Sequence, residues 1–439
     1  MASDLQAQTT EVLQRLVRFN TVNPPGGERE AQEYLADYLG DAGLDCELLG
    51  ALEDRPNLIA RLPGKADGPT LCYLGHVDTV LADADDWSVD PWSGHIVDGF
   101  LYGRGALDMK SQVAAEAVAV AELARSGWRP ARGELLLLCV VDEETGGANG
   151  AQWLTQQHPD KVRCDMVLNE GAGAPFDYDG RRYRGVCCAE KGIFRFTITT
   201  DGVAGHASMP RLGDNALLKM APLLERFSTT QPSFDVPEEA RALLQGIGEP
   251  LDADVAGLLE RLREADPMIA LMLEPMLGVS MTPTRIRASE KVNVIPAQAH
   301  LQVDCRVPPG RELEDVLPRI EEVLGPANGY RVSFDECVSG NRSPAETPLM
   351  QEIGRWTAEH DPGSSVVPTL LPGFSDSRWF RAAFPDCVAY GFFPQRHMTL
   401  YEAMPLIHSA DERIDVRDLG FATTFYRDLA ERILGNAAE

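Results

Sequence analysis

Residues 134–147 read ELLLLCVVDEETGG, and this stretch decides the fold. Seven apolar residues in succession, Leu135 to Val141, are too few for a membrane-spanning helix, which needs roughly 20. A near-continuous apolar run of this length is typical of a strand covered on both faces, as in a parallel sheet. Asp142, two glutamates and Thr-Gly-Gly follow, which predicts a tight turn at the end of this central strand.

The flanking segments alternate strands with helices. Further short apolar runs stand at 57–62, 70–75 and 165–170. Helix-like stretches occupy 5–20, about 28–40 after the turn VNPPGGE (22–28), and the Ala- and Val-rich residues 111–125. The same alternation of strands and helices returns near the end of the sequence. It has a helix at about 347–359, strands in VVPTLLPG and CVAYGFF, and a final helix from about Val416. This alternation indicates an α/β fold with a mainly parallel sheet.

A second kind of pattern begins after Lys191. The stretches IFRFTITT (193–200) and AHLQVDCRV (299–307) alternate apolar and polar residues, which suits a sheet with one wet face. The order of strands and helices over 193–338 is that of a ferredoxin-like α+β domain, interrupted by a helical insertion at about 237–275. We therefore predict a lid and dimerisation domain at 192–340, inserted between two parts of a catalytic α/β domain at 1–191 and 341–439.

Composition and charge narrow the range of partners. Lys and Arg number 40 and Asp and Glu number 67, for a net charge of −27. A surface this acidic repels phosphate backbones and anionic lipids, so we expect neither a nucleic-acid nor a membrane partner. The first residues, MASDLQAQTT, have neither a basic region nor an apolar core, and the nine scattered cysteines form no Cys-x-x-Cys pair. Both features favour a cytoplasmic protein with reduced thiols.

Metal-capable side chains follow the apolar runs in five segments. The segments are GHVDTV, GRGALDMK, VVDEETGG, LNEGAG and LIHSADER, which carry His76, Asp78, Asp108, Glu143, Glu144, Glu170 and His408. In an open parallel sheet, ligands bind beyond the carboxyl ends of the strands, so these side chains are expected to converge at one edge. Two imidazoles with several carboxylates suit two zinc ions that share one bridging carboxylate.

Each of these signals has an ordinary explanation when it is taken alone. A His-x-Asp pair is common at exposed strand ends, and adjacent glutamates usually belong to a solvated loop. His408 by itself is more typical of a surface or core histidine. Gly103 and Gly105 permit a close backbone approach near Asp108, but glycine-rich turns are also frequent without function. Only the whole set of segments indicates a metal site.

Taken in order, the five segments resemble the dizinc hydrolase family of aminoacylase, glutamate carboxypeptidase, acetylornithine deacetylase and succinyl-diaminopimelate desuccinylase. The resemblance covers nearly the whole chain, because VNPPGGE, GVAGHAS (202–208), NVIP (293–296) and SDSRWF (375–380) also match. It implies two divalent ions, of which zinc is the favoured choice, although cobalt or manganese would also suit these nitrogen and oxygen ligands.

The resemblance also implies a role for each ligand. Asp108 would bridge both ions and precede a cis peptide bond. The remaining ligands would divide into His76 and Glu170 for one ion, and Glu144 and His408 for the other. Asp78 would hold the imidazole of His76 in its tautomer. Glu143 would be the general base, taking a proton from the water between the metals and passing it to the leaving amine.

Residues of the inserted domain are implied to reach the substrate. His206 resembles the family histidine that polarises the scissile carbonyl, although a plain loop histidine is the alternative. Asn293 and Arg306 match lid positions that face substrate. Arg378, with Gly373 nearby, is a candidate for binding a substrate carboxylate, with a structural ion pair as the equal alternative. The resemblance further implies a homodimer through the lid, with His206 completing the site of the other chain.

The sequence therefore predicts a metal-dependent hydrolase that cleaves the amide bond of an N-acyl amino acid or small peptide. Glu170, rather than Asp, is what the family's deacylases and carboxypeptidases tend to carry, and this favours that type. A dipeptidase or aminopeptidase of the same family is the alternative, and a catalytically inactive binding relative is a further one. The acyl group, the amino-acid specificity and the role of the 237–275 insertion stay open.

Overall fold

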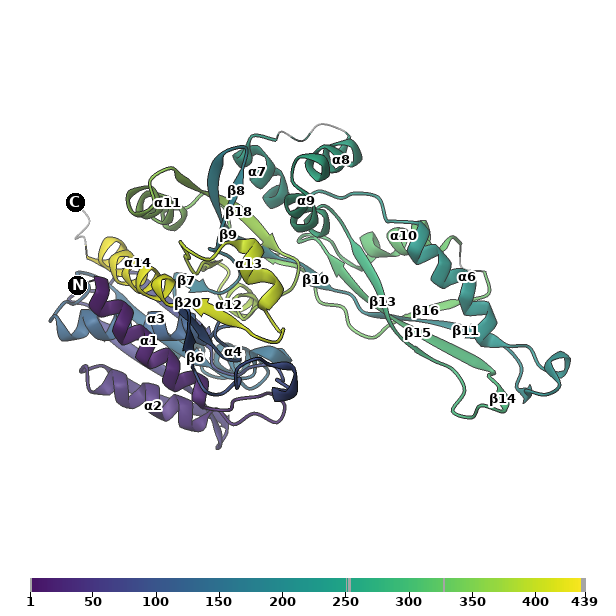
Figure 1. The fold of residues 1–439 in the computed structure, drawn as a ribbon, viewed down its shortest axis with the longest axis horizontal. Coiled ribbons are helices and arrows are strands. Elements are labelled where there is room, and N and C mark those ends of the chain that lie inside the picture. Colours follow the sequence, from purple (N-terminus) through teal and green to yellow (C-terminus); the bar gives the residue numbers. More distant parts are fainter. Residues whose placement is uncertain (1, 250, 252–253, 327, 436–439) are drawn as a thin grey trace. The chain divides into compact units, whose positions relative to one another are not determined.

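The computed structural model describes residues 2–249, 251, 254–326 and 328–435 (Figure 1). The chain separates into two compact units: unit 1 comprises Met1–Cys188, Ser343–Thr369 and Ser375–Glu439, and unit 2 comprises Ala189–Arg342 and Leu370–Phe374. Unit 2 is thus inserted into unit 1. The exact boundaries predicted after residues 191 and 340 stay predictions, since compactness does not show that either part folds alone.

Unit 1 is built on a large sheet whose four central strands are parallel. These are β6 (Glu134–Val140), β3 (Thr70–His76), β7 (Met166–Asn169) and β19 (Val388–Gly391), in that spatial order. Antiparallel strands flank them: β2 (Arg55–Pro63) and β1 (Asp45–Leu52) beyond β6, and β9 (Arg181–Glu190) beyond β19. The predicted α/β fold with a mainly parallel central sheet is confirmed.

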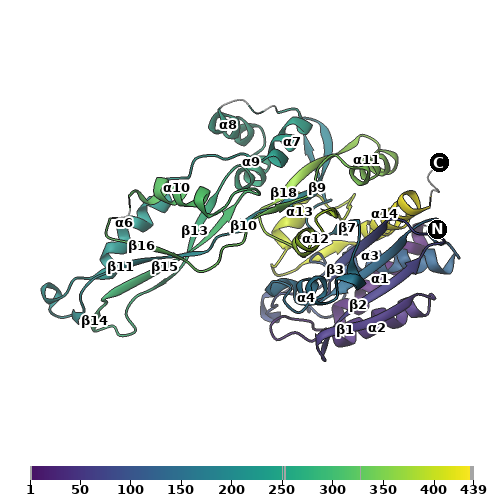
Figure 2. The same ribbon diagram turned by 180° about the vertical axis from the view of Figure 1, so that it is seen from behind.

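Both faces of β6 are buried, as its apolar run predicts. Leu135, Leu137 and Cys139 belong to a core shared with one group of helices, namely α1 (Ala2–Arg18), α2 (Arg29–Gly40), α3 (Lys110–Arg125), α11 (Pro348–His360) and α14 (Val416–Leu434). Their neighbours Leu136 and Leu138 belong to a second core on the opposite face, with α4 (Ala151–Gln157), α5 (Pro159–Val162) and α12 (Ser377–Ala383). Because strand side chains alternate between faces, this one strand contributes to both cores. Helices of these cores, among them α1, α2 and α4, lie against the sheet in Figure 2.

Short elements complete unit 1. A small three-stranded sheet contains β4 (Ile96–Val97), β5 (Phe100–Tyr102) and β20 (Arg413–Asp415). The hairpin strand β8 (Pro175–Tyr178) pairs with β9, as does β18 (Ser364–Leu371), and α13 (Leu400–Ala403) precedes β20. The sequence does not predict β1, whose residues are exposed or half-exposed, because it lacks a clear apolar alternation. Nor does it predict the β8–β9 hairpin, because β8 has only four residues and β9 begins with charged ones, although most residues of both strands are buried.

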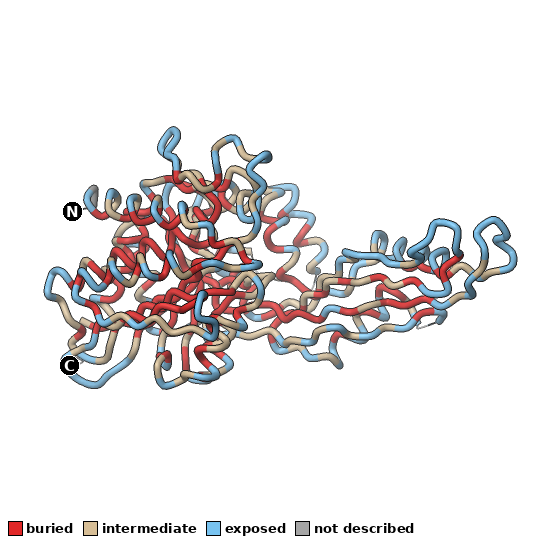
Figure 3. The backbone as a smooth tube through the Cα atoms, turned by 90° about the horizontal axis from the view of Figure 1, so that it is seen from below, coloured by how far each residue is buried: buried red, intermediate tan, exposed pale blue. Residues whose placement is uncertain are grey.

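Unit 2 has a ferredoxin-like core, as predicted. Its main strands lie in the order β13 (Ser280–Arg287), β15 (Gln298–Val307), β11 (Phe196–Asp201) and β16 (Arg331–Phe334), all antiparallel, with β10 (Gly192–Ile193) also paired to β15. Two helices, α6 (Ala216–Thr229) and α10 (Leu313–Leu324), pack on one face of this sheet. The residues of β15 are alternately buried and more exposed, which is the pattern of a sheet with one covered face. Figure 3 shows the buried segments of the chain in red and its exposed segments in pale blue.

The predicted helical insertion is present in unit 2. It contains α7 (Glu238–Ile247), α8 (Val255–Ala265) and α9 (Pro267–Leu273). The ammonium group of the buried Lys191 donates to the backbone oxygens of Pro275 and Gly278, just after α9. Short strands β12 (Gly205–His206) and β14 (Val294–Ile295) form a separate ribbon, and β17 (Asn341–Arg342) ends the unit's main segment. Among the described helices, none combines the length and apolarity needed to cross a membrane.

The central position of β6 leads to a stability prediction. Leu137→Ala would leave a cavity at a side chain with no exposed surface, so we expect the free energy of unfolding to fall by about 2–5 kcal/mol. The matched control is Leu81→Ala, since Leu81 is 71% exposed and its loss should change stability by less than about 0.5 kcal/mol. Denaturant titration measures both variants, and equal effects would contradict a central role for β6.

Candidate metal centre

Three neighbouring parallel strands deliver the first group of site residues. His76 is the last residue of β3, Glu143 and Glu144 begin the short 3₁₀ turn that follows β6, and Glu170 directly follows β7. In the parallel register His76 lies opposite Val140, the last residue of β6. The carboxyl ends of parallel strands meet at one edge of a sheet, so the predicted convergence is observed there.

Two loops bring the remaining ligand candidates to the same edge. Asp108 precedes α3, and His408 lies in the loop before β20. Asp108 Oδ1 is 3.2 Å from His76 Nε2, and Asp108 Oδ2 is 3.1 Å from His408 Nε2. One carboxylate oxygen thus faces each imidazole, which is the arrangement needed of a bridging ligand.

The spacing of the donor atoms suits divalent ions. His408 Nε2 lies 3.3 Å from Glu144 Oε2, and His76 Nε2 lies 3.8 Å from Glu170 Oε1. Ligands about 2.1 Å from a tetrahedral zinc ion stand about 3.4 Å from one another. In each of two sets of three residues, one donor atom per residue lies within 4.8 Å of the others. The sets are His76, Glu143 and Glu170, and His76, Asp108 and Glu144.

Electrostatics also point to a cation at this cluster. Burial, helped by the neighbouring Glu170, raises the pKa of the Glu143 carboxyl well above its usual range. Burial and then the charge of Asp108 raise the pKa of Glu170 to about 7. Glu144 Oε1 is buried without a hydrogen-bond partner. A divalent ion would offset this crowding of carboxylates and give that oxygen a partner, so the residues fit such an ion.

Asp78 organises the backbone around the cluster. Its carboxylate oxygens accept hydrogen bonds from the backbone N–H groups of Glu143 and Glu144, at 3.2 Å each. The Nδ1–H of His76 donates to the backbone oxygen of Asp78 at 3.0 Å, with Asp78 Oδ1 3.5 Å away. Because Nδ1 carries the proton, Nε2 presents its lone pair toward Asp108, as a metal-binding imidazole requires.

The turn after β6 has an unusual backbone conformation, and a buried network of side-chain hydrogen bonds holds it in place. Asp142 adopts a positive φ of 72°, which is rare outside glycine. Its carboxylate accepts from the side chains of Asn23, Arg55 and Asn149. Asn23 also donates to Asp78 Oδ2 at 2.9 Å, which links this turn to the support of His76. The sequence does not predict these roles, although Asn23 stands in the motif VNPPGGE.

The peptide bond between Asp108 and Met109 is cis, as the resemblance implied. The predicted substrate residues are divided between the two units. His206, Asn293, Arg306 and Gly373 belong to unit 2, whereas Arg378 belongs to unit 1. Arg306 is paired with Asp304, and the guanidinium of Arg378 stacks 4.7 Å from the Trp379 ring. Their roles toward a substrate stay predictions.

A comparison with known families decides the wider identity. The family model "Peptidase family M20/M25/M40" matches residues 72–432, which is most of the chain and includes every ligand candidate of the cluster. The chain belongs to this peptidase family. It is therefore a hydrolase of amide bonds, as the sequence predicts, with a site for a pair of metal ions.

Two curated relatives are similar over much of their length. A probable carboxypeptidase S-like 2 of Dictyostelium discoideum is 27% identical over 381 residues, which are 82% of this chain and 70% of the relative. A succinyl-diaminopimelate desuccinylase of Rhodospirillum centenum is 27% identical over 440 residues, 96% of each chain. The resemblance to this group of enzymes is confirmed at the level of the family.

Solved structures share the fold. An M20 family metallo-carboxypeptidase from Sulfolobus solfataricus aligns with a TM-score of 0.71 at 19% identity, covering 96% of this chain and 98% of that one. A dinuclear metal-binding peptidase of the M20 family from Bacillus subtilis aligns with a TM-score of 0.62 at 13% identity, covering 99% and 100%. At these identities the likeness concerns the architecture, including the inserted unit.

The crowded cluster predicts that divalent ions stabilise this M20 chain. An ion that binds only the folded state, at 100 times its Kd, adds about 2.7 kcal/mol. Zn²⁺, Co²⁺ or Mn²⁺ should therefore raise the melting temperature of the metal-free protein, and a chelator should reverse the change. Asp108→Asn should weaken this response, whereas Asp177→Asn, an exposed aspartate paired with Arg182, should keep it. The same response in both variants would contradict the site.

Proposed function

We propose that this chain is a zinc-dependent deacylase or carboxypeptidase that hydrolyses the amide bond of an N-acyl amino acid or small peptide. The observation that carries the proposal is the position of Glu143. Its Oε2 lies 3.9 Å from His76 Nε2, so a raised-pKa carboxyl stands directly beside the ligand cluster. Ligands with an adjacent proton carrier are what amide hydrolysis needs.

The cluster divides into two ligand sets that share Asp108. His76 and Glu170 complete one, and Glu144 and His408 the other. Ions held there would polarise the scissile carbonyl and lower the pKa of water, with Zn²⁺ preferred and Co²⁺ or Mn²⁺ also suited to these donors. Asp78 keeps His76 in the metal-binding tautomer, because the Nδ1–H of that imidazole donates to the Asp78 backbone oxygen.

Glu143 moves the proton. Its carboxylate takes a proton from the attacking water, and the resulting carboxylic acid delivers a proton to the departing amine nitrogen, so one water molecule and one amide yield an acid and an amine. Burial keeps the pKa of Glu143 above its usual range, which allows the side chain to act both as base and as acid. The backbone N–H of Glu143 is held by Asp78.

His206 is proposed to stabilise the developing oxyanion. Its Nδ1 accepts the backbone N–H of Ser208 at 3.2 Å and lies 2.7 Å from Ser208 Oγ. In the neutral imidazole this leaves the proton on Nε2, where it can be donated to a substrate oxygen. Asn293 lies close to His206 in the fold, because its backbone oxygen accepts the N–H of the next residue, Ala207.

The substrate class rests on charge and on the relatives. Carboxypeptidases and desuccinylases are named for substrates that carry a free carboxylate. Arg378 and Arg306 are proposed to bind it, and Gly373 to contact the substrate. The net charge of −27 opposes nucleic acid and anionic membranes as partners. All nine cysteines are free thiols, which favours the cytoplasm.

A substrate panel with one variant tests this proposal. Wild type with added Zn²⁺, Co²⁺ or Mn²⁺ should hydrolyse N-acyl amino acids or dipeptides that end in a free carboxylate. Glu143→Ala should still bind two ions but lose about 100-fold or more in kcat, because only the proton carrier is removed. Glu53→Ala, at an exposed position of unit 1, should match wild type. Normal turnover by Glu143→Ala, or loss of both ions, would show that its role is misassigned.

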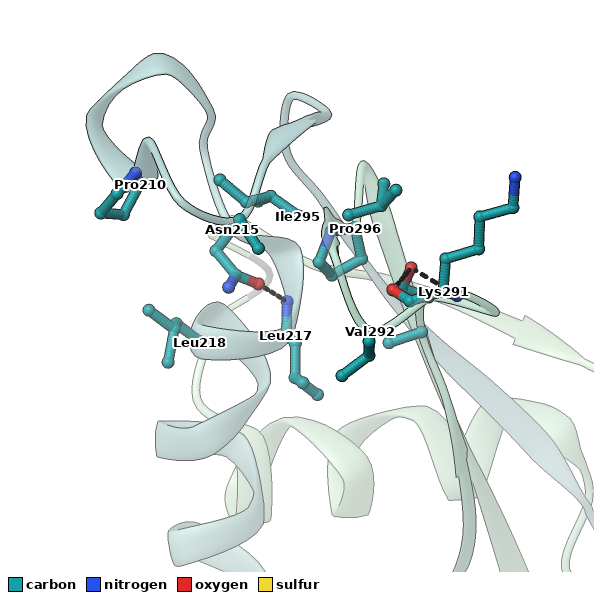
Figure 4. A pocket seen from close by; sticks show the side chains of 12 residues that line it. Pro210, Asn215, Leu217, Leu218, Lys291, Val292, Ile295 and Pro296 are labelled. Carbon is teal, nitrogen blue, oxygen red and sulfur yellow. Dashed lines mark hydrogen bonds between the residues drawn. The ribbon is translucent and has the colours of Figure 1, made fainter.

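Unit 2 is proposed to bind a second copy of the chain. A pocket of about 580 Å³ lies beside His206, lined mostly by apolar residues of α6 and of the segment around β14, together with Asn215, Ser289 and Lys291 (Figure 4). Leu218 is 70% exposed and Val292 is fully exposed, although both are large apolar residues. A twofold contact that buries such surface would also carry His206 toward the partner, since Val294 pairs with His206 and lines the pocket.

Subunit mixing tests whether His206 acts across that contact. Glu143→Ala and His206→Ala should each be nearly inactive alone. After reversible dissociation and mixing, some dimers would contain one site with both wild-type residues, so part of the activity should return. If the mixture stays inactive despite proven subunit exchange, or if a monomer is fully active, the proposed exchange of His206 is wrong.

A further inference from the structure

Glu412 connects two loops that carry ligands. It stands four residues after His408 and has no exposed surface. Its Oε1 accepts the backbone N–H groups of Leu107 at 2.6 Å and of Asp108 at 3.0 Å. Its Oε2 accepts the backbone N–H of Gly105 at 3.1 Å. One side chain from the His408 loop therefore holds the backbone of the Asp108 loop at three points.

The charge of Glu412 is balanced inside the protein. Arg104, only 3% exposed, donates from Nη1 to Glu412 Oε2 at 2.6 Å and from Nη2 to the backbone oxygen of Leu81. The guanidinium also lies 5.2 Å from the Trp87 ring. A buried carboxylate is tolerated only when it is paired and hydrogen-bonded, and here both oxygens are used. The contact is thus a specific polar network in which both oxygens of the buried carboxylate have partners.

The main chain makes the same connection. The backbone N–H of Gly103 donates to the backbone oxygen of Glu412, and the adjacent residues Tyr102 and Arg413 belong to the paired strands β5 and β20. Asp108 and His408 are 300 positions apart in the chain, yet Asp108 Oδ2 and His408 Nε2 are 3.1 Å apart. Glu412 is the side chain that joins their two loops by hydrogen bonds.

We propose that Glu412 is a positioning residue that sets the separation of Asp108 and His408, and with it the ion site that these two share with Glu144. The proposal rests on the proposed function for the division of ligands between two sites. Glu412 touches neither ion nor substrate: it acts by fixing the N–H of Asp108 and the backbone that follows His408. Groups that orient metal ligands in this way typically contribute 10–100-fold to metal affinity.

A matched control separates positioning from plain stability. Asp418 on α14 is also a buried carboxylate, and it accepts the backbone N–H groups of Arg396, His397 and Met398 at 2.7–2.9 Å. It therefore makes the same kind of contact as Glu412, but with a loop that carries no ligand of the cluster. Removing either negative charge should lower the melting temperature, whereas only the Glu412 change should alter the metal site.

The experiment is a Co²⁺ titration of metal-free wild type, Glu412→Gln and Asp418→Asn, followed by visible absorption. In Glu412→Gln an amide N–H group replaces one acceptor and Arg104 loses its anionic partner. We expect the second Co²⁺ to bind about 10–100-fold more weakly, with an altered spectrum, and kcat to fall. Asp418→Asn should bind both ions as wild type does.

The outcomes separate this inference from the proposed function. Wild-type affinity and spectrum in Glu412→Gln, or equal weakening in Asp418→Asn, would overturn the positioning role. If Glu412→Gln does not fold, Glu412→Asp decides by the same criteria, because it keeps the charge beside Arg104 but withdraws the carboxylate by one methylene group. A wild type that binds two Co²⁺ ions but hydrolyses no amide would overturn only the proposed function, since the titration needs no substrate.

Discussion

The structure depends on holding four carboxylates and two imidazoles together against electrostatic repulsion. Two like charges 4 Å apart repel by about 4 kcal/mol at an effective dielectric constant of about 20. Burial, together with this crowding, raises the pKa of Glu143 well above its usual range and that of Glu170 to about 7. Such an arrangement persists only where a rigid scaffold prevents the side chains from separating and where cations reduce the negative charge. The surrounding fold meets the first condition.

The scaffold consists of a doubly covered sheet with fixed loops at its edge. β6 is packed on both faces, so the turn that carries Glu143 and Glu144 starts from one of the most constrained points of unit 1. Two buried carboxylates then fix the loops: Asp78 holds the N–H groups of Glu143 and Glu144, and Glu412 holds the N–H of Asp108. Buried carboxylates that accept backbone N–H groups thus fix the loops that carry the carboxylate ligands of the site.

Sequence patterns predicted much of this site because local chemistry carries it. The apolar run before Asp142 indicates the central strand, and polar residues at strand ends are brought together by the geometry of any parallel sheet. The edge strand β1 was not predicted, because its exposed and half-exposed residues resemble a loop. The roles of Asn23 and Glu412 were not predicted either, although these residues stand in the motifs VNPPGGE and LIHSADER. Their hydrogen-bond partners lie far away in the chain, so no local pattern indicates them.

The sequence by itself determined the α/β class, the inserted ferredoxin-like unit and the residue types available as ligands, because periodicity and strand-end chemistry are local properties. Only the tertiary structure decided that each oxygen of Asp108 faces a different histidine and that Glu412 holds the Asp108 loop. Such contacts join loops about 300 residues apart, and their distances follow from the pairing of β5 with β20 and from the packing of the loops on the sheet. No spacing along the chain encodes them.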